Sequence, residues 1–245
     1  MKVKILGYGE IGQSLANIYR KKDYEPAIQD IDNHFGDYEC DLLNICIPYS
    51  DKFIEIVVNE ITQSKAKYVI IHSTVRVGTT AEIEKQLFLS GSTVTVCHSP
   101  VIGVHPNLTQ SLHTFTKWIG ANVPCNDILN HLWDYGFKAY VLGKSETTEI
   151  MKLWDTTYYG MCLAINAEVK TILENHGIEY QLWIRYIQAY NEGYESMGMP
   201  NVIRPYFPNL KMPIGGHCII PNFKILEEIT DMSGFNLLKK YGDIT

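Results

Sequence analysis

The sequence has no long apolar run and no recognisable leader segment. No stretch of about 20 apolar residues occurs, so we expect no membrane-spanning helix and no membrane partner. The chain begins Met-Lys-Val-Lys-Ile-Leu-Gly, which is typical of a β-strand, and this apolar run is too short for a signal peptide. A cytoplasmic location is therefore expected.

Clustered positive charge and closely spaced cysteines are also missing. The 21 Lys and Arg residues are outnumbered by 27 Asp and Glu residues, giving a net charge of −6 without a basic face. Nucleic acid is therefore not expected as a partner. None of the six cysteines falls in a Cys-x-x-Cys pair, so we predict no zinc ribbon and no metal site.

The first half of the chain alternates short apolar runs with amphipathic stretches. Strands are expected at residues 3–6, 27–29, 42–47, 68–71, 94–97, 117–119 and 139–142, and helices at 11–19, 53–61, 81–87 and 127–135. Strands that alternate with helices form βαβ units. The sequence therefore predicts an α/β fold that starts with a doubly wound parallel sheet of the Rossmann type.

The pattern changes near residue 145. From 146 to 176 the chain has no proline, a single glycine and apolar residues at helical spacing, which predicts one long helix. Further helices are expected at 181–196 and around 223–229. We therefore expect two domains, a Rossmann domain over 1–145 and a helical domain over 146–245.

A glycine motif connects the first expected strand to the first helix. Gly7-Tyr8-Gly9-Glu10-Ile11-Gly12 has the Gly-x-Gly-x-x-Gly spacing that permits a tight turn, a close approach of a pyrophosphate and close helix–strand packing. Asp30, at the end of the next strand, can accept hydrogen bonds from the ribose hydroxyls of NAD and repel the 2′-phosphate of NADP. Asp32 is an alternative, and an ordinary strand–helix turn is the competing interpretation. The motif predicts an NAD site at Gly7, Tyr8, Gly9, Glu10, Ile11, Gly12 and Asp30.

Three later strand ends are expected to line the same crevice, because ligands of such sheets bind at the carboxyl ends of the strands. They are Ile47-Pro48-Tyr49-Ser50, His72-Ser73-Thr74 and His98-Ser99-Pro100. We predict cofactor contacts from Ile47, Pro48, Tyr49, Ser73 and Thr74. His72 and His98 are either proton carriers or structural histidines.

Taken together, these segments resemble the UDP-glucose/GDP-mannose dehydrogenase family. Ile47-Pro48-Tyr49-Ser50 is similar to its V-P-T-P segment, and Ser73 to Thr80 is close to its S-T-V-x-x-G-T-T. Glu149 and Lys152 resemble its E-x-x-K, and Gly215-Gly216-His217-Cys218-Ile219 is similar to the G-G-H-C-I of its aminosugar branch. The motifs follow the family's order over roughly residues 1–230.

The resemblance implies oxidation of a primary alcohol to a carboxylate with two NAD molecules. Cys218 would be the nucleophile that forms a thiohemiacetal and then a thioester, Lys152 would stabilise developing oxyanions, and Thr74 would help to position water. The competing interpretations are a structural Cys218 and a Lys152 that forms a surface ion pair with Glu149 or nearby acids.

Three positions depart from the family pattern. Val101 stands where the family has a catalytic glutamate, Thr156 where it has an asparagine, and Asn222 where it has an aspartate. We count Thr156 and Asn222 among the candidate catalytic positions. The family's C-terminal nucleotide-binding domain has no counterpart in the printed sequence, so a smaller substrate or a completing partner is expected.

Three functions therefore stay open. The first is an NAD-dependent dehydrogenase that acts on an alcohol of a small-molecule substrate with Cys218 and Lys152. The second is a single-step β-hydroxyacid-type dehydrogenase that uses Lys152 alone, and the third is a non-catalytic NAD-binding or regulatory protein. The stripe Trp154, Tyr158, Met161 and Ile165 on the long helix predicts either a homodimer through residues 146–176 or burial within the same chain.

Overall fold

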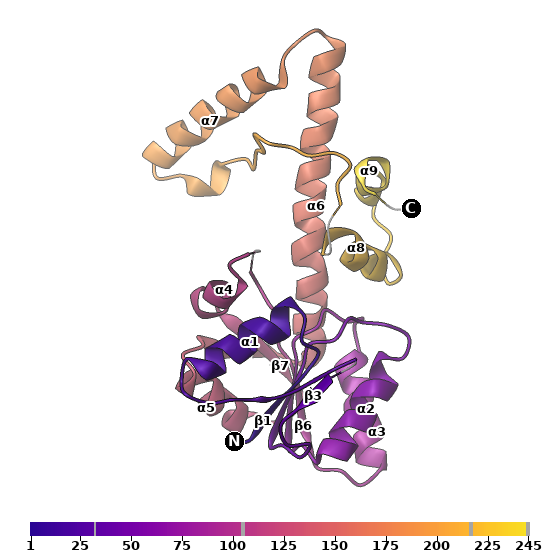
Figure 1. The fold of residues 1–245 in the computed structure, drawn as a ribbon. Coiled ribbons are helices and arrows are strands. Elements are labelled where there is room, and N and C mark those ends of the chain that lie inside the picture. The colour runs from indigo at the N-terminus through magenta and orange to yellow at the C-terminus, as the bar shows by residue number, and fades with distance from the viewer. Residues whose placement is uncertain (32, 104–105, 216–217, 244–245) are drawn as a thin grey trace. The chain divides into compact units, whose positions relative to one another are not determined.

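The chain forms two compact units in the computed structural model, which describes residues 1–31, 33–103, 106–215 and 218–243 (Figure 1). The first unit covers Met1–Lys152 and the second covers Leu153–Thr245. The division falls inside the long helix α6 (Ser145–Asn175), so the first two turns of this helix belong to the first unit.

An eight-stranded sheet forms the centre of the first unit, in the order β3-β2-β1-β4-β5-β6-β7-β8. The strands are β1 (Val3–Leu6), β2 (Ala27–Asp30), β3 (Asn33–Phe35), β4 (Leu42–Ile45), β5 (Tyr68–Ile71), β6 (Thr95–His98), β7 (Lys117–Ala121) and β8 (Ala139–Gly143). Strands β2, β1, β4, β5 and β6 are parallel, and the strand order reverses at β1. The predicted Rossmann-type sheet is confirmed.

The two ends of the sheet differ from the prediction. Strand β3, which was not predicted, pairs antiparallel with β2, and β7 pairs antiparallel with β6. Strand β8 then runs parallel to β7. Apolar periodicity indicates that a segment is a strand but carries no information about its direction, which explains the difference.

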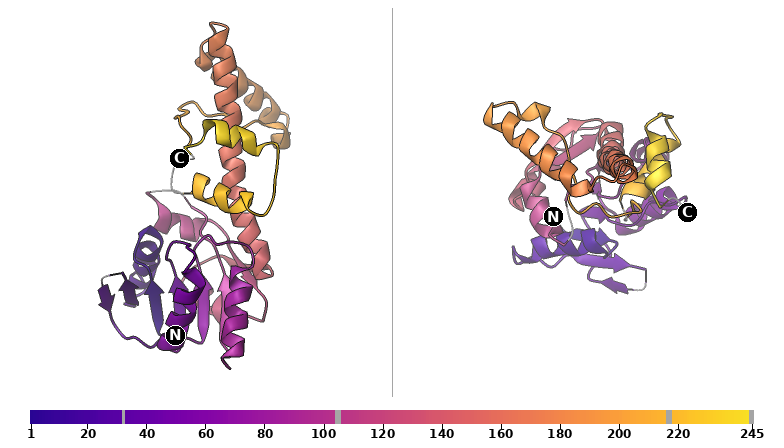
Figure 2. Two further views of the ribbon diagram at one scale, coloured as in Figure 1. Left: turned by 90° about the vertical axis from the view of Figure 1, so that its right-hand side faces the viewer. Right: turned by 90° about the horizontal axis from the view of Figure 1, so that it is seen from above.

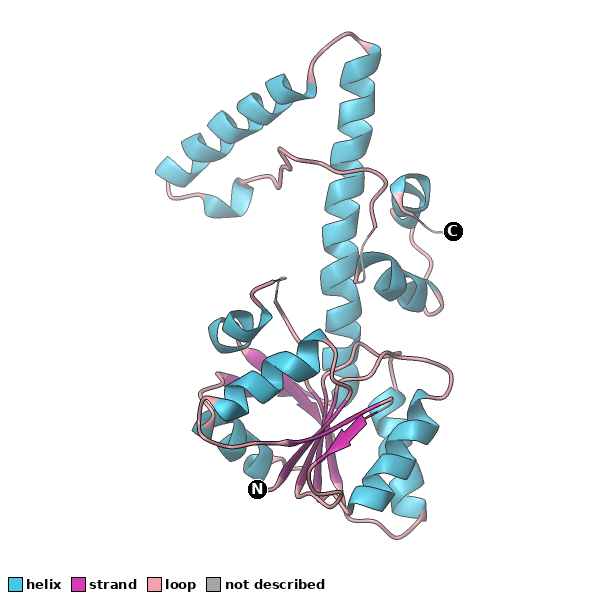
Figure 3. Cartoon of the chain, in the orientation of Figure 1, coloured by secondary structure: helices cyan, strands magenta, loops and turns pink. Residues whose placement is uncertain are grey.

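Helices cover both faces of this sheet (Figures 1 and 3). Apolar side chains of α1 (Glu10–Arg20), α4 (Leu108–Thr114) and α5 (Asn126–Asp134) pack with Val3 and Ile5 in one buried cluster. Those of α2 (Phe53–Ser64) and α3 (Thr79–Leu89) pack with Leu6 and Leu43 in the other. Strands β1, β4, β5 and β6 therefore contribute residues to both cores.

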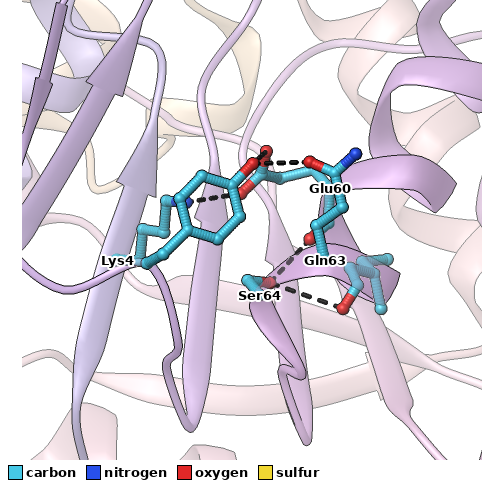
Figure 4. A network of polar contacts seen from close by, with 6 residues as sticks. Lys4, Glu60, Gln63 and Ser64 are labelled. Atoms are coloured by element: carbon cyan, nitrogen blue, oxygen red, sulfur yellow. Dashed lines mark hydrogen bonds and ion pairs between the residues drawn. The ribbon is translucent and has the colours of Figure 1, made fainter.

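One charged pair lies inside the second of these layers. Lys4 of β1 is fully buried and its Nζ lies 2.6 Å from Oε1 of Glu60 on α2, as Figure 4 shows. The same Nζ lies 3.6 Å from the centre of the Tyr38 ring. A buried ammonium needs such partners because its transfer from water is costly.

The second unit is helical. It contains the rest of α6, α7 (Tyr180–Ser196), the 3₁₀ turn η1 (Pro200–Val202), α8 (Ile219–Glu227) and α9 (Phe235–Tyr241). Helices α8 and α9 lie beside α6 in both side views (Figures 1 and 2). The close packing depends on Gly160 of α6, because a Cβ there would lie 2.5 Å from Ile219 and 3.0 Å from Leu238.

The long helix and the helix at 181–196 are confirmed within a residue or two, whereas the helix expected around 223–229 is wrong at its start. Helix α8 begins at Ile219 because Pro221 falls in its first turn, where the missing N–H breaks no helical hydrogen bond. The short helices α4 and α9 were not predicted. No described helix has the length and the apolar character needed to cross a membrane.

Candidate nucleotide-binding site

The glycine turn between β1 and α1 has the geometry that the sequence motif requires. Gly7 has φ +94°, and a Cβ there would lie 2.8 Å from the carbonyl group of Cys46. A Cβ on Gly12 would collide with the carbonyl oxygen of Gly7, so the third glycine permits the close helix–strand packing. A Cβ on Gly9, by contrast, would meet nothing within 4 Å. Gly9 therefore faces open space.

The start of α1 is available for an anion. Gly9 is the N-cap residue and makes no side-chain capping hydrogen bond, and the first helical bond runs from Gln13 N–H to Gly9 O. Glu10 is exposed and Ile11 is half-buried beside this turn. Tyr8 is held in place because the Arg20 guanidinium donates to its hydroxyl over 2.9 Å. Since a helix N-terminus attracts phosphate through its N–H groups, these residues fit a dinucleotide pyrophosphate.

Asp30 is the exposed last residue of β2, the strand next to β1. Its Oδ1 accepts a hydrogen bond from the N–H of Ile31 over 2.9 Å, which orients the carboxylate. The carboxyl end of β2 lies on the same edge of the sheet as the glycine turn because β1 and β2 are parallel. Asp32, the alternative to Asp30, lies outside the described residues.

The structure joins two of the predicted strand-end loops directly. Ser73 follows β5, and its hydroxyl donates to the carbonyl oxygen of Ile47, after β4, over 2.6 Å. Tyr49 packs its ring 5.4 Å from that of Phe53. Pro48 is exposed and Thr74 is half-buried next to these anchored residues. The loops at 47–49 and 73–74 therefore border one edge of the sheet together.

His72 and His98 are structural residues in this arrangement. Each is buried, with at most 1% of its surface exposed, and both ring nitrogens of each have partners. His98 Nε2 donates to the carbonyl of Ser73 over 3.1 Å, and its Nδ1 accepts from the hydroxyl of Thr148 over 2.8 Å. Burial lowers the pKa of His98 to about 3 and the pKa of His72 well below its ordinary value. Both rings are therefore neutral and fully engaged.

Lys152 lies one helical turn after Thr148 on α6 and is half-buried. Burial is the main cause of the lowered pKa of His98, and the positive charge of Lys152 lowers it further. Glu149 anchors this turn of α6. Its carboxylate accepts hydrogen bonds from Gly78 N–H over 2.6 Å and from the N–H and hydroxyl of Thr80 over 2.9 Å and 2.6 Å. Glu149 thus caps α3.

Val101, at the position of the family glutamate, is only 8% exposed and belongs to the apolar core of the first unit. Sequence reasoning missed two further polar residues nearby, Thr148 and the buried Lys117. The signal for Lys117 was a lysine within an otherwise apolar strand, as also holds for Lys4.

The remaining candidates lie in the second unit. Cys218 is exposed and is the N-cap residue of α8. Asn222, one turn further along α8, is 5% exposed, and its Nδ2 donates to the hydroxyl oxygen of Thr156 on α6 over 2.9 Å. Two of the three positions that depart from the pattern of the similar family therefore bond to each other. Gly216 and His217 lie outside the described residues.

No group of three or more His, Cys, Asp or Glu side chains that could hold a metal ion is found among the residues described. The residues that surround the glycine turn fit a dinucleotide instead. Such a ligand needs open space, which is present at Gly9, and a helix N-terminus without a side-chain cap. It also needs a carboxylate at the end of the next strand.

No protein-family model matches the sequence, and no curated protein matches it. Solved structures do match its fold. UDP-D-ManNAc dehydrogenase from Pyrococcus horikoshii superposes with a TM-score of 0.76 at 17% identity, over 99% of this chain and 68% of that one. A UDP-glucose dehydrogenase from Pyrobaculum islandicum gives 0.74 at 13% identity, over 98% and 67%.

A smaller enzyme matches over almost its full length. Mycobacterium tuberculosis 3-hydroxyisobutyrate dehydrogenase has a TM-score of 0.67 at 13% identity, and the match covers 98% of this chain and 91% of that one. At such identities the similarity concerns the fold. The chain has the fold of dehydrogenases whose substrates range from nucleotide sugars to a small hydroxy acid.

Proposed function

We propose that this chain is an NAD-dependent oxidoreductase that oxidises a CH–OH group of a small-molecule substrate. The observation that carries the proposal is the glycine turn, where Gly9 faces open space at the N-terminus of α1 beside the carboxylate of Asp30. Similarity in fold to dehydrogenases of two substrate classes supports it.

Each part of the site has a role in binding. The N–H groups at the start of α1 bind the pyrophosphate, and Asp30 accepts hydrogen bonds from the ribose hydroxyls. The same carboxylate repels a 2′-phosphate, which favours NAD over NADP. Ile47, Pro48, Tyr49, Ser73 and Thr74 border the crevice beyond.

Lys152 is the residue of the first unit best suited to serve the substrate hydroxyl. Bound NAD supplies the hydride acceptor, and the hydroxyl proton must pass to a nearby group or to water. Val101 has no proton-accepting group, and the neutral His98 ring is occupied on both sides. The Lys152 ammonium, held on an anchored turn of α6, would stabilise the developing alkoxide through its charge.

A two-step oxidation through Cys218 is the second candidate, favoured by the exposure of this thiol at the start of α8. The Cys218 thiolate would add to the aldehyde to give a thiohemiacetal. Transfer of a second hydride to a second NAD, with loss of the hydroxyl proton, would give a thioester, and water would release the carboxylate and the thiol. Binding of NAD without any turnover is the third outcome that an assay must distinguish.

The first experiment tests the nucleotide site without an assay of activity. Gly9→Ala should weaken NAD binding at least about tenfold in calorimetry, because the new methyl group stands where the pyrophosphate approaches. The melting temperature should not change, since that methyl group meets no protein atom. Gly193→Ala, another glycine with open space around its Cβ position, is the control. Equal NAD affinity in Gly9→Ala and the unaltered chain would contradict the proposed site.

The second experiment counts NADH. A panel of alcohols, hydroxy acids and sugar nucleotides is oxidised to completion, and the NADH formed per substrate is measured. Two NADH and complete loss of carboxylate formation in Cys218→Ala support the two-step reaction. One NADH, with activity retained in Cys218→Ala and lost in Lys152→Met, supports the single step. NAD binding without turnover across the panel would overturn the enzymatic proposal.

A further inference from the structure

Lys117 is a buried lysine without an acidic partner among the residues that the structure describes. It is the first residue of β7 and is 4% exposed. Its Nζ donates to Nδ1 of His72 over 3.0 Å and to the carbonyl oxygen of Ser99 over 3.1 Å. Both acceptors are neutral, so nothing in this contact set compensates a positive charge on Lys117.

These partners lie at the carboxyl ends of the parallel strands. His72 directly follows β5, and Ser99 directly follows β6. Cys46 directly follows β4, and the charge of Lys117 partly offsets the rise that burial causes in the pKa of its thiol. Lys117 therefore lies beneath the strand-end loops that border the proposed nucleotide site.

Lys117 is the group of this cluster whose charge changes near neutral pH. Three titratable groups face it, namely His72, His98 and Cys46. Burial lowers the pKa of both histidines far below neutrality and raises the pKa of Cys46 to about 12, so these groups stay neutral between pH 6 and 8.5. Burial lowers the pKa of Lys117 to about 7.

The charge on Lys117 matters because the two redox forms of the cofactor differ by one charge. The nicotinamide ring is positively charged in NAD⁺ and neutral in NADH, whereas the rest of the molecule is the same. We propose that Lys117 sets the preference of this site for the redox state of the cofactor: its protonated form disfavours NAD⁺ relative to NADH, and its neutral form removes this bias. The inference rests on the proposed function.

A consequence is that exchange of NAD⁺ for NADH takes up a proton from solvent at Lys117. Two unit charges about 10 Å apart, at an effective dielectric constant near 20, change a binding constant by roughly tenfold. The change is smaller if water enters the crevice. A threefold effect is therefore the threshold that the experiment must resolve.

The test measures the dissociation constants of NAD⁺ and NADH by calorimetry at pH 6.0 and pH 8.5. The ratio of the NAD⁺ constant to the NADH constant should be at least threefold higher at pH 6.0. Contributions from the shared adenosine and pyrophosphate groups cancel in this ratio. In Lys117→Met, which keeps an unbranched apolar stem, the ratio should be the same at both pH values.

Cys125→Ser is the matched control, because a hydrogen bond with Cys97 lowers the pKa of the Cys125 thiol to about 7 as well. This variant should retain the pH dependence. If Lys117→Met does not fold, the unaltered chain still gives an answer: NADH binding at pH 7 should take up more protons than NAD⁺ binding, as measured in buffers of different ionisation enthalpy.

The outcomes separate the two proposals. If neither nucleotide binds the unaltered chain, the proposed function falls and the inference falls with it. If both bind with a pH-independent ratio and equal proton uptake, or if Lys117→Met retains the full pH dependence, only the role of Lys117 is overturned.

Discussion

The two units of this chain differ in how they bury charge, whereas both expose large apolar side chains. The first unit buries charged and polar side chains with partners, among them Lys4 with Glu60 and Glu149 with the start of α3. The second unit leaves large apolar side chains exposed along its two long helices. They are Tyr158, Tyr159, Ile165 and Ile172 on α6 and Leu182 and Tyr186 on α7.

This difference assigns different tasks to the units. In the first unit, buried polar contacts tie strand ends and helix starts together, which fixes the loops around the glycine turn. In the second unit, Trp154 packs against Phe235, whereas Tyr158 and Ile165 of the same stripe stay 64% and 49% exposed. Because contiguous exposed apolar surface marks an interface, we propose that a second copy of the chain covers this face of α6.

The largest expected effect concerns the buried charges of the first unit. Lys4→Met should lower the free energy of unfolding by about 3 to 5 kcal/mol, because it leaves the Glu60 carboxylate buried without its cation. Lys2→Met is the control, since Lys2 and Asp37 form an exposed pair worth at most about 1 kcal/mol. Urea denaturation measures both. Similar losses in the two variants would show that burial of the Lys4 pair is not what matters.

The next largest effect is a loss of stability in acid, which should be confined to the first unit. His72 and His98 have lowered pKa values in the folded chain, so the unfolded chain binds more protons below about pH 6.5. Their contribution to stability is therefore complete above pH 6.5 and is lost as the pH falls. Between pH 6.5 and 5 the loss is about 2 kcal/mol for each histidine.

Hydrogen exchange followed by mass spectrometry, corrected for intrinsic exchange rates, measures this effect region by region. Peptides from β5 and β6 should lose protection between pH 6.5 and 5, and peptides from α7 should not. His176, the histidine described in the second unit, is exposed and serves as the internal comparison. Equal loss in both units would mean that acid acts on something other than the two buried rings.

The proposed dimer contact lies on α6 of the second unit. Ile165→Glu places a charge on the exposed face of α6 and should raise the dimer dissociation constant at least about tenfold, as measured by analytical ultracentrifugation. Phe88→Glu is the control, because Phe88 is 78% exposed on α3 of the first unit and is not part of the apolar stripe of α6. A monomeric unaltered chain at micromolar concentration would refute the proposal.

Sequence reasoning succeeded where a local pattern determines the structure. The Gly7–Gly12 motif specifies a turn whose backbone cannot accommodate side chains at two of its positions, so its geometry followed from residue type alone. The long helix was predicted because proline is absent and apolar spacing is regular over 31 residues. Such features depend on neighbours in sequence.

The features that were missed depend on contacts between distant segments. Thr148 bonds His98 across 50 residues, and Lys117 bonds His72 across 45. A lysine at the start of a strand is ordinarily exposed, and only the antiparallel placement of β7 beside β6 turns this one inward. The three-residue β3 is too short for any period to be detected, and its pairing with β2 comes from the hairpin.

The smallest expected effect concerns a buried polar contact of the second unit, the hydrogen bond between Asn222 and Thr156. Thr156→Val removes the oxygen that accepts from Asn222, whose side chain is 5% exposed, and leaves a buried donor unsatisfied at a cost of about 1 kcal/mol. Thr171→Val on the same helix is the control, because Thr171 is exposed and its hydroxyl donates to the α6 backbone at Ala167 and accepts a long bond of 3.5 Å from Tyr241. Hydrogen exchange should report faster opening of α8 in Thr156→Val and no change in Thr171→Val. Cys218 is the N-cap residue of α8. Faster exchange confined to this helix would therefore show that the bond between Asn222 and Thr156 holds the candidate nucleophile in place. Equal exchange in both variants would show that apolar packing around Gly160 does so instead.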